Sequence, residues 1–282
     1  MSVWGATGLF TASWLAACAV LLPLTLRLLP EAGLVGLNYA RARIPVGLGL
    51  FIWACAAVEW ALAGAWVGLG LPLPVWLKAP PSHYWMPLTI VFFAGLIDDA
   101  IGDTRVKGLR GHLAALFARG VVTTGLFKAA AVAAASLWAA GALADSFAQG
   151  AVMFGVMLLS ANGVNLLDVR PARALKAFFA LGVLLFAAAP EEAPAWLVPP
   201  AVGALLVFRH DRKAQAMLGD MGANPLGFCL GFAACRALPW WGLAIWLTLA
   251  AGLHWTAERR SITRLIEENR WLAWLDRLGR GG

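Results

Sequence analysis

The sequence predicts an all-α integral membrane protein, a polytopic helical bundle of about nine transmembrane helices. The chain is 61% hydrophobic, and only 13% of its 282 residues are Asp, Glu, Lys or Arg. Its mean hydropathy of +0.75 is too high for an ordinary soluble domain. Three uncharged stretches, Val3–Leu26, Ser146–Leu167 and Ala237–Ala257, are long enough as helices to cross a hydrocarbon core of about 30 Å. The four cysteines all lie in apolar runs without metal-ligand spacing, so we expect buried free thiols.

Charged segments and prolines divide the chain into the predicted spans. The charged segments are the loops around 27–43, 98–119, 168–176 and 209–221, and Pro190 separates the sixth span from the seventh. Proline and glycine inside a span are tolerated because neighbouring helices satisfy the freed backbone groups. The predicted spans are residues 4–27, 44–66, 84–97, 119–140, 148–166, 176–190, 194–208, 222–236 and 239–257. They are predicted to form one domain, 1–282. Its first apolar run does not resemble a cleaved secretory signal, so we expect it to remain as a transmembrane helix.

The distribution of basic residues orients these spans. With the amino terminus outside, the four charged loops and the carboxyl-terminal tail share one face, which collects most of the Lys and Arg residues. Because Lys and Arg accumulate in cytoplasmic loops, this face and the carboxyl terminus are predicted to be cytoplasmic. The net charge of +7 has the same cause, and no nucleic-acid partner is expected. The predicted location is the cell inner (plasma) membrane.

The tail, residues 258–282, alternates apolar and charged residues at nearly helical spacing. Ile262, Leu265, Trp271, Trp274 and Leu275 are among its apolar positions. This pattern predicts an amphipathic helix on the cytoplasmic surface, and a helix packed on the bundle is the alternative.

Two adjacent carboxylates, Asp98 and Asp99, end the third predicted span. Carboxylates gathered on one membrane face beside many arginines suggest a divalent metal and a phosphorylated substrate. Adjacent side chains at a helix end point to different sides, so one can face a metal while the other meets substrate. Their mutual repulsion would raise the pKa of one of them unless a cation lies between them. Two solvated acids in a polar loop are the alternative.

Polar side chains also end the fifth span. Asn162, Asn165 and Asp168 recur every three residues, which places them on one helical face at the membrane boundary. They could read a nucleobase edge or complete a metal shell. Asparagine in membranes more commonly joins helices by hydrogen bonds, but three polar groups ending in a carboxylate are costly for that purpose alone.

Two further residues complete the candidate set. Asp220 lies in a Gly-Asp-x-Gly segment that opens the eighth span, where glycine lets the backbone approach a ligand and a helix amino terminus favours phosphate. A simple turn is the alternative. Lys128 lies inside the fourth span, where it either reaches back to the interface or contacts a phosphate.

In this order and spacing, the motifs resemble the polyprenyl-phosphate N-acetylhexosamine-1-phosphate transferases. That family includes the phospho-N-acetylmuramoyl-pentapeptide transferase of peptidoglycan synthesis and the UDP-GlcNAc:undecaprenyl-phosphate transferases. The resemblance covers roughly Asn38 to Gly227, and Asn38–Gly49 looks like the family's first cytoplasmic loop. The matching residues are Asp98 and Asp99, Lys107 in a Lys-Gly-Leu loop, Lys128, Asn162, Asn165 and Asp168 in Asn-x-x-Asn-x-x-Asp, and Asp220 in Gly-Asp-x-Gly.

The resemblance implies a Mg²⁺-dependent enzyme, with Mn²⁺ as a substitute metal. It would transfer a sugar-1-phosphate, an N-acetylhexosamine-1-phosphate, from a UDP-sugar to polyprenyl (undecaprenyl) phosphate and release UMP, as the first membrane step of cell-wall or surface glycan synthesis. Asp220 would bind the metal, with Asp99 completing its shell or holding substrate. The implied catalytic residues are Asp98, Asp99, Asp220, Lys107 and Lys128, and the implied substrate contacts are Asn162, Asn165 and Asp168. Beside the resemblance, Arg170 and Arg173 could add phosphate contacts, although the topology alone would also place arginines there.

Two other function classes stay open. Val169, Arg170 and Pro171 follow Asp168 where the family usually has glycine, which favours a catalytically inactive relative that binds nucleotide-sugar or lipid carrier. A transporter or flippase would instead place ionisable residues near the bilayer midplane, where only Glu59 and Lys128 are expected. The lipid bilayer is an expected partner in every case, and a homodimer is a further one.

Overall fold

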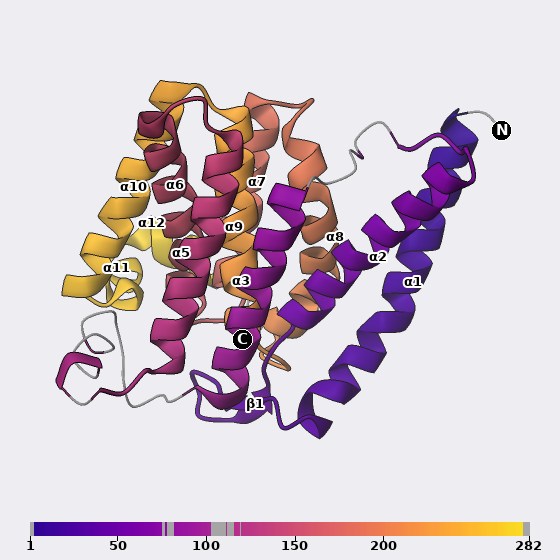
Figure 1. The fold of residues 1–282 in the computed structure, drawn as a ribbon. Coiled ribbons are helices and arrows are strands. Elements are labelled where there is room, and N and C mark those ends of the chain that lie inside the picture. The colour runs from indigo at the N-terminus through magenta and orange to yellow at the C-terminus, as the bar shows by residue number, and fades with distance from the viewer. Residues whose placement is uncertain are drawn as a thin grey trace.

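The computed structural model describes residues 3–74, 77, 82–102, 111, 116–118 and 120–278. Within this part of the chain the protein is a helical bundle with one small hairpin (Figure 1). The elements are α1 (Val3–Glu31), β1 (Val35–Leu37), β2 (Arg43–Pro45), α2 (Gly49–Gly68), α3 (Ser82–Ile101), α5 (Thr124–Leu143), α6 (Phe147–Leu167), α7 (Arg173–Ala188), α8 (Ala193–Arg212), α9 (Asp220–Ala237), α10 (Trp240–Arg259), α11 (Ile262–Glu268) and α12 (Arg270–Arg277).

The chain is a mostly helical membrane protein, as predicted. Five helices are long and apolar enough to cross a membrane: α1, α2, α3, α5 and α6. Each of the other four predicted spans also coincides with a helix, α7 to α10. The number of nine membrane crossings and the orientation of the bundle stay predictions. The four cysteines are buried and free, as expected.

The hairpin departs from the all-α prediction. β1 and β2 pair antiparallel with Gly36 opposite Ile44, and Val46 then forms a parallel bridge to Met217, next to the start of α9. Inside the hairpin turn, the Asn38 side chain accepts the backbone N–H groups of Ala40 and Ala42, each at 2.9 Å. Because these residues pair as strands, α2 begins at Gly49 instead of residue 44.

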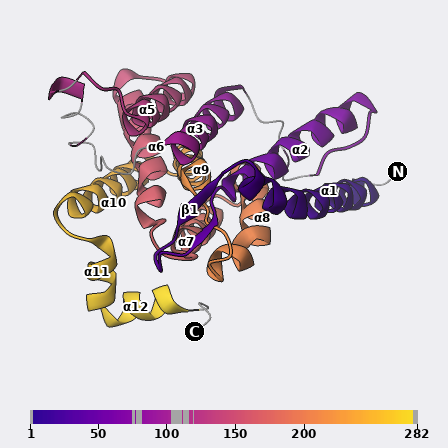
Figure 2. The same ribbon diagram turned by 90° about the horizontal axis from the view of Figure 1, so that it is seen from below.

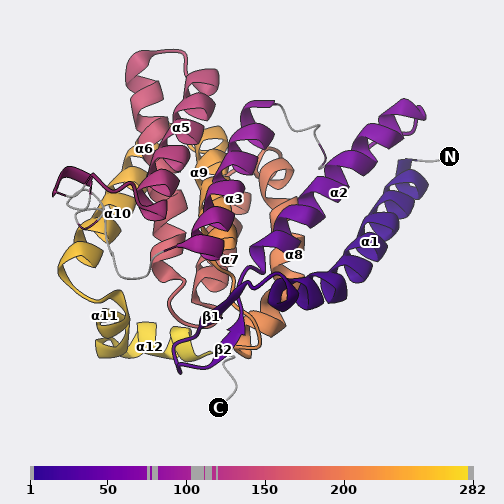
Figure 3. The same ribbon diagram turned by 60° about the horizontal axis from the view of Figure 1, so that its bottom comes forward.

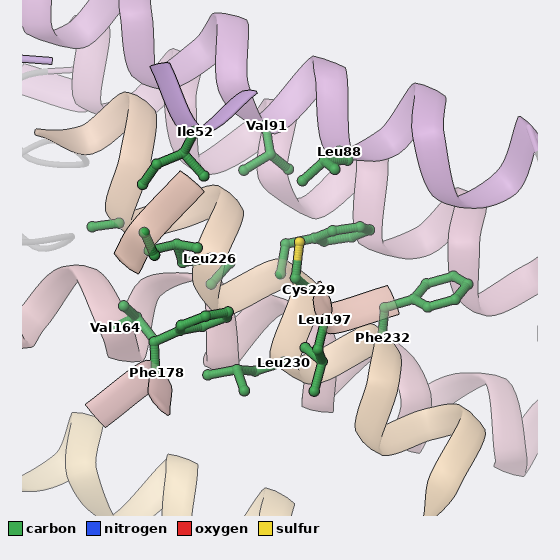
Figure 4. Close-up of a cluster of buried hydrophobic side chains, with 14 of the residues drawn as sticks. Ile52, Leu88, Val91, Val164, Phe178, Leu197, Leu226, Cys229, Leu230 and Phe232 are labelled. Carbon is green, nitrogen blue, oxygen red and sulfur yellow. The ribbon is translucent and has the colours of Figure 1, made fainter. Parts of the chain in front are cut away.

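Helix α9 is the core of the bundle. Every residue from Met221 to Cys235 is buried, and α9 packs on α2, α3, α6, α7 and α8. Seen from below, it lies among those helices (Figure 2). Its apolar side chains meet residues from all of its neighbours, as Figure 4 shows for Leu226, Cys229, Leu230 and Phe232 with Ile52, Leu88, Val91, Val164, Phe178 and Leu197. The first residue of this central helix, Asp220, therefore lies at the centre of one end of the bundle.

Candidate functional site

Two carboxylates from different helices meet one lysine at this end of the bundle. The Lys128 ammonium donates to Asp98 Oδ2 at 2.6 Å and also to Asp220 Oδ2. The three side chains come from α5, α3 and α9, and they are only 14%, 15% and 25% exposed. Ion pairs with so little solvent are screened less than surface pairs. The structure thus brings together Asp98, Lys128 and Asp220, which the sequence had identified separately.

The local sequence explains the position of Lys128. The Thr123 hydroxyl accepts the Leu126 N–H at 3.3 Å and caps α5, so the helix begins at Thr124. Lys128 therefore lies one turn into α5 and close to the end of the bundle, instead of the deeper position that a span beginning at residue 119 would give it.

Asp99 plays a different part from Asp98. Its two carboxylate oxygens accept the backbone N–H groups of Asp220 at 3.0 Å and Met221 at 2.9 Å. The residue at the N-cap position of α9 is Gly219, which has no side chain to cap the helix. Asp99 supplies the missing cap from α3, and its charge is favourable at the positive end of the helix dipole.

Two glycines permit this approach of α3 and α9. Gly219 has φ +75°, and a Cβ there would lie 2.6 Å from Asp99 Oδ2. A Cβ on Gly95 would lie 2.5 Å from the backbone oxygen of Asp220. Both distances are far below van der Waals contact, so the site depends on glycine at these positions.

Asp168 ends α6 beside the same cluster. Its carboxyl lies close to the backbone of Gly219, the residue directly before Asp220 in the chain. Burial, followed by the negative charges of Asp211, Asp220 and Asp99, raises the pKa of the Asp168 carboxyl well above its ordinary value. Asp168 therefore belongs electrostatically to the Asp98–Lys128–Asp220 cluster.

Asp168 also lines a cavity of about 280 Å³. Asn38 and Tyr39 of the hairpin turn line it, together with Arg170 and Asp211. The Arg170 guanidinium lies 5.1 Å from the centre of the Tyr39 ring, which is within the range of a cation–π contact. Asp168 is thus shared by a carboxylate–lysine cluster and a cavity with an aromatic wall.

No family model matches this chain, and no curated protein matches its sequence. Its function therefore has to be inferred from the chemistry of this end of the bundle. That chemistry combines clustered carboxylates, one shared ammonium group and an adjoining cavity.

A magnesium ion is compatible with these side chains on chemical grounds. Mg²⁺ prefers carboxylate oxygens and commonly takes only one or two from the protein, with water and substrate phosphates completing its shell. Asp98 and Asp220 offer two carboxylates that already converge on one positive charge. Among the described residues no group of three or more His, Cys, Asp or Glu side chains could hold a metal by itself.

The two candidate arginines contact the tail of the chain. Arg173 is only 5% exposed, and its guanidinium binds Asp276 through Nε at 2.8 Å and through a second nitrogen at 3.0 Å. It also donates to the Thr263 hydroxyl at 3.0 Å. Arg170, besides lining the cavity, pairs with Glu267 at 3.3 Å. The structure thus gives Arg173 a tail contact and Arg170 contacts with both the tail and the cavity.

The Asn162 side chain contacts a residue of α10. The Asn162 amide lies 2.9 Å from His254 Nε2 on α10, and the other ring nitrogen lies 2.8 Å from the Ala250 carbonyl oxygen. If His254 donates to that carbonyl, its Nε2 accepts from Asn162 and the pair joins two helices. Asn165 is half-buried on α6, three residues before Asp168. Lys107 lies outside the described residues.

Two residues of the site were missed in the sequence. Asp211 follows Arg209 and His210 and precedes Arg212, so it was read as part of a basic loop. In the structure its carboxylate accepts the Ala172 N–H at 2.7 Å and shapes the turn after Asp168. Tyr39 carried a usable signal, since it is one of only two tyrosines in the chain and lies in a basic loop.

Proposed function

We propose that this protein is a Mg²⁺-dependent membrane phosphoglycosyltransferase. It transfers a sugar-1-phosphate, such as N-acetylhexosamine-1-phosphate, from a UDP-sugar to a polyprenyl phosphate and releases UMP. The observation that carries the proposal is the convergence of Asp98, Lys128 and Asp220 at one end of a membrane-embedded bundle, beside the cavity that Asp168 lines.

The charge of the site supports a divalent metal. Asp98, Asp99 and Asp220 lie together, and Lys128 is the cation that contacts two of them. Two like charges 4 Å apart repel by about 4 kcal/mol at an effective dielectric constant of 20, which exceeds the gain from one hydrogen bond. A diphosphate could not enter such a site without a further cation. Magnesium would provide that charge.

The carboxylates that would hold the metal are Asp220 and Asp98. Asp99 was the sequence-based candidate for the second ligand, but both of its oxygens accept backbone N–H groups of α9. We therefore propose Asp99 as the residue that positions Asp220. When bound, the metal would neutralise charge on the phosphates, which is the main requirement of phosphoryl transfer.

The other side chains bind and orient the two substrates. The cavity of about 280 Å³ is near the lower limit of ligand pockets, about 300–1,000 Å³, so it suits the nucleoside part of a UDP-sugar. Tyr39 and Asp168 would contact that nucleoside, and Lys128 would hold a phosphate oxygen. An oxygen of the lipid phosphate then bonds to the sugar-bearing phosphorus. The bond from that phosphorus to the bridging oxygen breaks, and the bridging oxygen leaves with UMP.

Purified protein with UDP-GlcNAc, undecaprenyl phosphate and Mg²⁺ tests the proposal, followed by a panel of other UDP-sugars. We expect UMP release that needs Mg²⁺ and falls by at least about 100-fold in Asp220→Asn. Asp145→Asn, an equivalent change at an exposed residue between α5 and α6, is the control and should retain full activity.

Each alternative gives a different result in the same assay. UDP-sugar binding without turnover across the panel would identify a non-catalytic relative. Uptake of unchanged substrate into sealed vesicles would identify a transporter. Full activity of Asp220→Asn would refute the metal assignment.

A further inference from the structure

The two carboxyl-terminal helices are attached to the bundle along one edge of α12. Besides the Arg173–Asp276 ion pair, the Lys176 ammonium donates to the carbonyl oxygens of Leu275 at 3.0 Å and Asp276 at 2.7 Å. Ala273, on the same edge, is only 3% exposed. Arg173 and Lys176 belong to the first turn of α7, so α12 is fixed at that end of α7.

The opposite face of α12 is apolar and uncovered. Trp271, Trp274, Leu275 and Leu278 follow the i, i+3, i+4, i+7 spacing that places side chains on one helical face. All four are exposed, Trp271 to 78% and Trp274 to 57%. A pattern in which Asp276 faces the bundle and the tryptophans face outward is the reverse of ordinary core packing.

The position of α11 and α12 relative to the bundle indicates what covers the apolar face of α12. Seen from below, α11 and α12 lie beside the bundle (Figure 2), and Figure 3 shows them running across the axes of the main helices, at the end that carries the hairpin. They follow directly on α10, whose Ile245, Leu249 and Trp255 are exposed on the outside of the same membrane-embedded bundle. The apolar face of α12 therefore continues an outer surface that already carries apolar side chains.

We propose that α11 and α12 form a membrane-surface anchor whose apolar face lies in the interfacial layer of the bilayer that holds the bundle. Tryptophan is enriched in that layer, because its ring is apolar and its N–H is polar. Amphipathic helices of this kind lie in the membrane plane with their apolar side toward the acyl chains. Arg270 and Arg277, both exposed, are seven residues apart on a different edge of α12 and can reach the headgroups.

Two observations favour lipid over a second copy of the chain. Helix α12 lies outside the group of bundle helices (Figure 2). The preceding long helix, α10, carries the exposed apolar residues Ile245, Leu249 and Trp255, which a bilayer would cover. The contacts of Arg173 and Lys176 complete the polar edge within the same chain, so no partner is needed to satisfy Asp276. The anchor therefore packs on the bundle by one edge and on lipid by the other.

Site-directed spin labelling of the full chain in nanodiscs tests this proposal. The four buried cysteines are replaced by alanine, and single labels are placed at Trp271→Cys, Leu275→Cys and, as the control edge, Arg270→Cys. We expect labels at 271 and 275 to be several-fold more accessible to oxygen than to an aqueous nickel chelate, and the ratio to reverse at 270. Equal access of the nickel chelate to all three labels would refute the anchor. If the labels at 271 and 275 became accessible to the nickel chelate in nanodiscs that hold a single protein molecule, the face would instead be covered by a second copy of the chain.

A second measurement does not require new cysteines. Brominated lipids quench tryptophans that contact the acyl region, so the wild-type chain should lose more fluorescence than Trp271→Phe/Trp274→Phe. Equal quenching of the wild-type chain and this variant would contradict the proposal, even if the cysteine-free protein failed to fold.

Discussion

Asp99 accepts the backbone N–H of Asp220 at 3.0 Å, so one acidic residue of the site holds another in place. The contact joins α3 to the first turn of α9, across 121 residues of sequence. It divides the adjacent pair Asp98 and Asp99 into two roles. Asp98 faces Lys128, whereas Asp99 caps the helix that presents Asp220.

The Asp99 cap predicts a loss of stability when this carboxylate is removed. Asp99→Ala should lower the free energy of unfolding by about 1–3 kcal/mol, because two N–H groups of α9 lose a charged acceptor. Asp99→Asn, which keeps one carbonyl acceptor, should lose less. Thermal unfolding in detergent measures both. If Asp99→Ala instead raised the Mg²⁺ concentration for half-maximal activity and left stability unchanged, Asp99 would be a metal ligand, as the sequence first suggested.

Lys128 neutralises two carboxylates, so its removal should expose their repulsion. Lys128→Met should cost about 3 kcal/mol, since Asp98 and Asp220 are then left without their cation. Added Mg²⁺ should raise the melting temperature more in this variant than in the wild-type protein. Lys213→Met, at an exposed position, is the control. An equal Mg²⁺ effect in both proteins would show that the ion does not bind at these carboxylates.

Gly219→Ala should be more damaging than an equivalent change at another glycine of the same conformation. Gly120 also has positive φ, +66°, but a Cβ there would meet no atom of the described residues within 4 Å. Gly120→Ala therefore measures backbone strain alone, about 1–2 kcal/mol. Gly219→Ala adds the contact with Asp99, so its melting temperature should be lower and its Mg²⁺-dependent activity lost. Equal melting temperatures of Gly219→Ala and Gly120→Ala would mean that the Asp99 side chain can move away from residue 219 with little loss of stability.

The Tyr39 ring should contribute to nucleotide affinity. Tyr39→Ala removes the partner of the Arg170 guanidinium and opens the cavity wall, so UDP should bind about 2–5-fold more weakly, the equivalent of about 0.5–1 kcal/mol. Tyr39→Phe retains the ring and should bind UDP like the wild-type protein. Calorimetric titration with UDP provides the measurement. Unchanged affinity in Tyr39→Ala would place the nucleoside outside this cavity.

Hydrophobic runs and the charges at their ends were sufficient to predict the helices and the region of the site. Long apolar runs such as Ser146–Leu167 form helices because their own backbone groups must be satisfied within the membrane. The hairpin could not be predicted in this way. Its strands have three residues each and are completed by a bridge to Met217, which is far away in the sequence.

The roles of individual polar residues were harder to predict than their presence. The sequence offers Arg173 as a possible phosphate contact, but its partner, Asp276, is 103 residues further along the chain. Asn162 was grouped with Asp168 by spacing, yet its partner is His254 on α10. Spacing identifies residues that share a helix face, whereas the partner of each depends on how helices pack, which spacing does not contain.

The burial of α9 has a consequence for the biosynthesis of the protein. The helices against which α9 packs in the described structure, α2, α3, α6, α7 and α8, all precede it in the chain. They leave the ribosome first, so these helices can already surround the space for α9 before Asp220–Ala237 is synthesised. A segment that carries Asp220, Asn224 and Arg236 can then settle against earlier helices, without having to be hydrophobic enough to partition into lipid unaided.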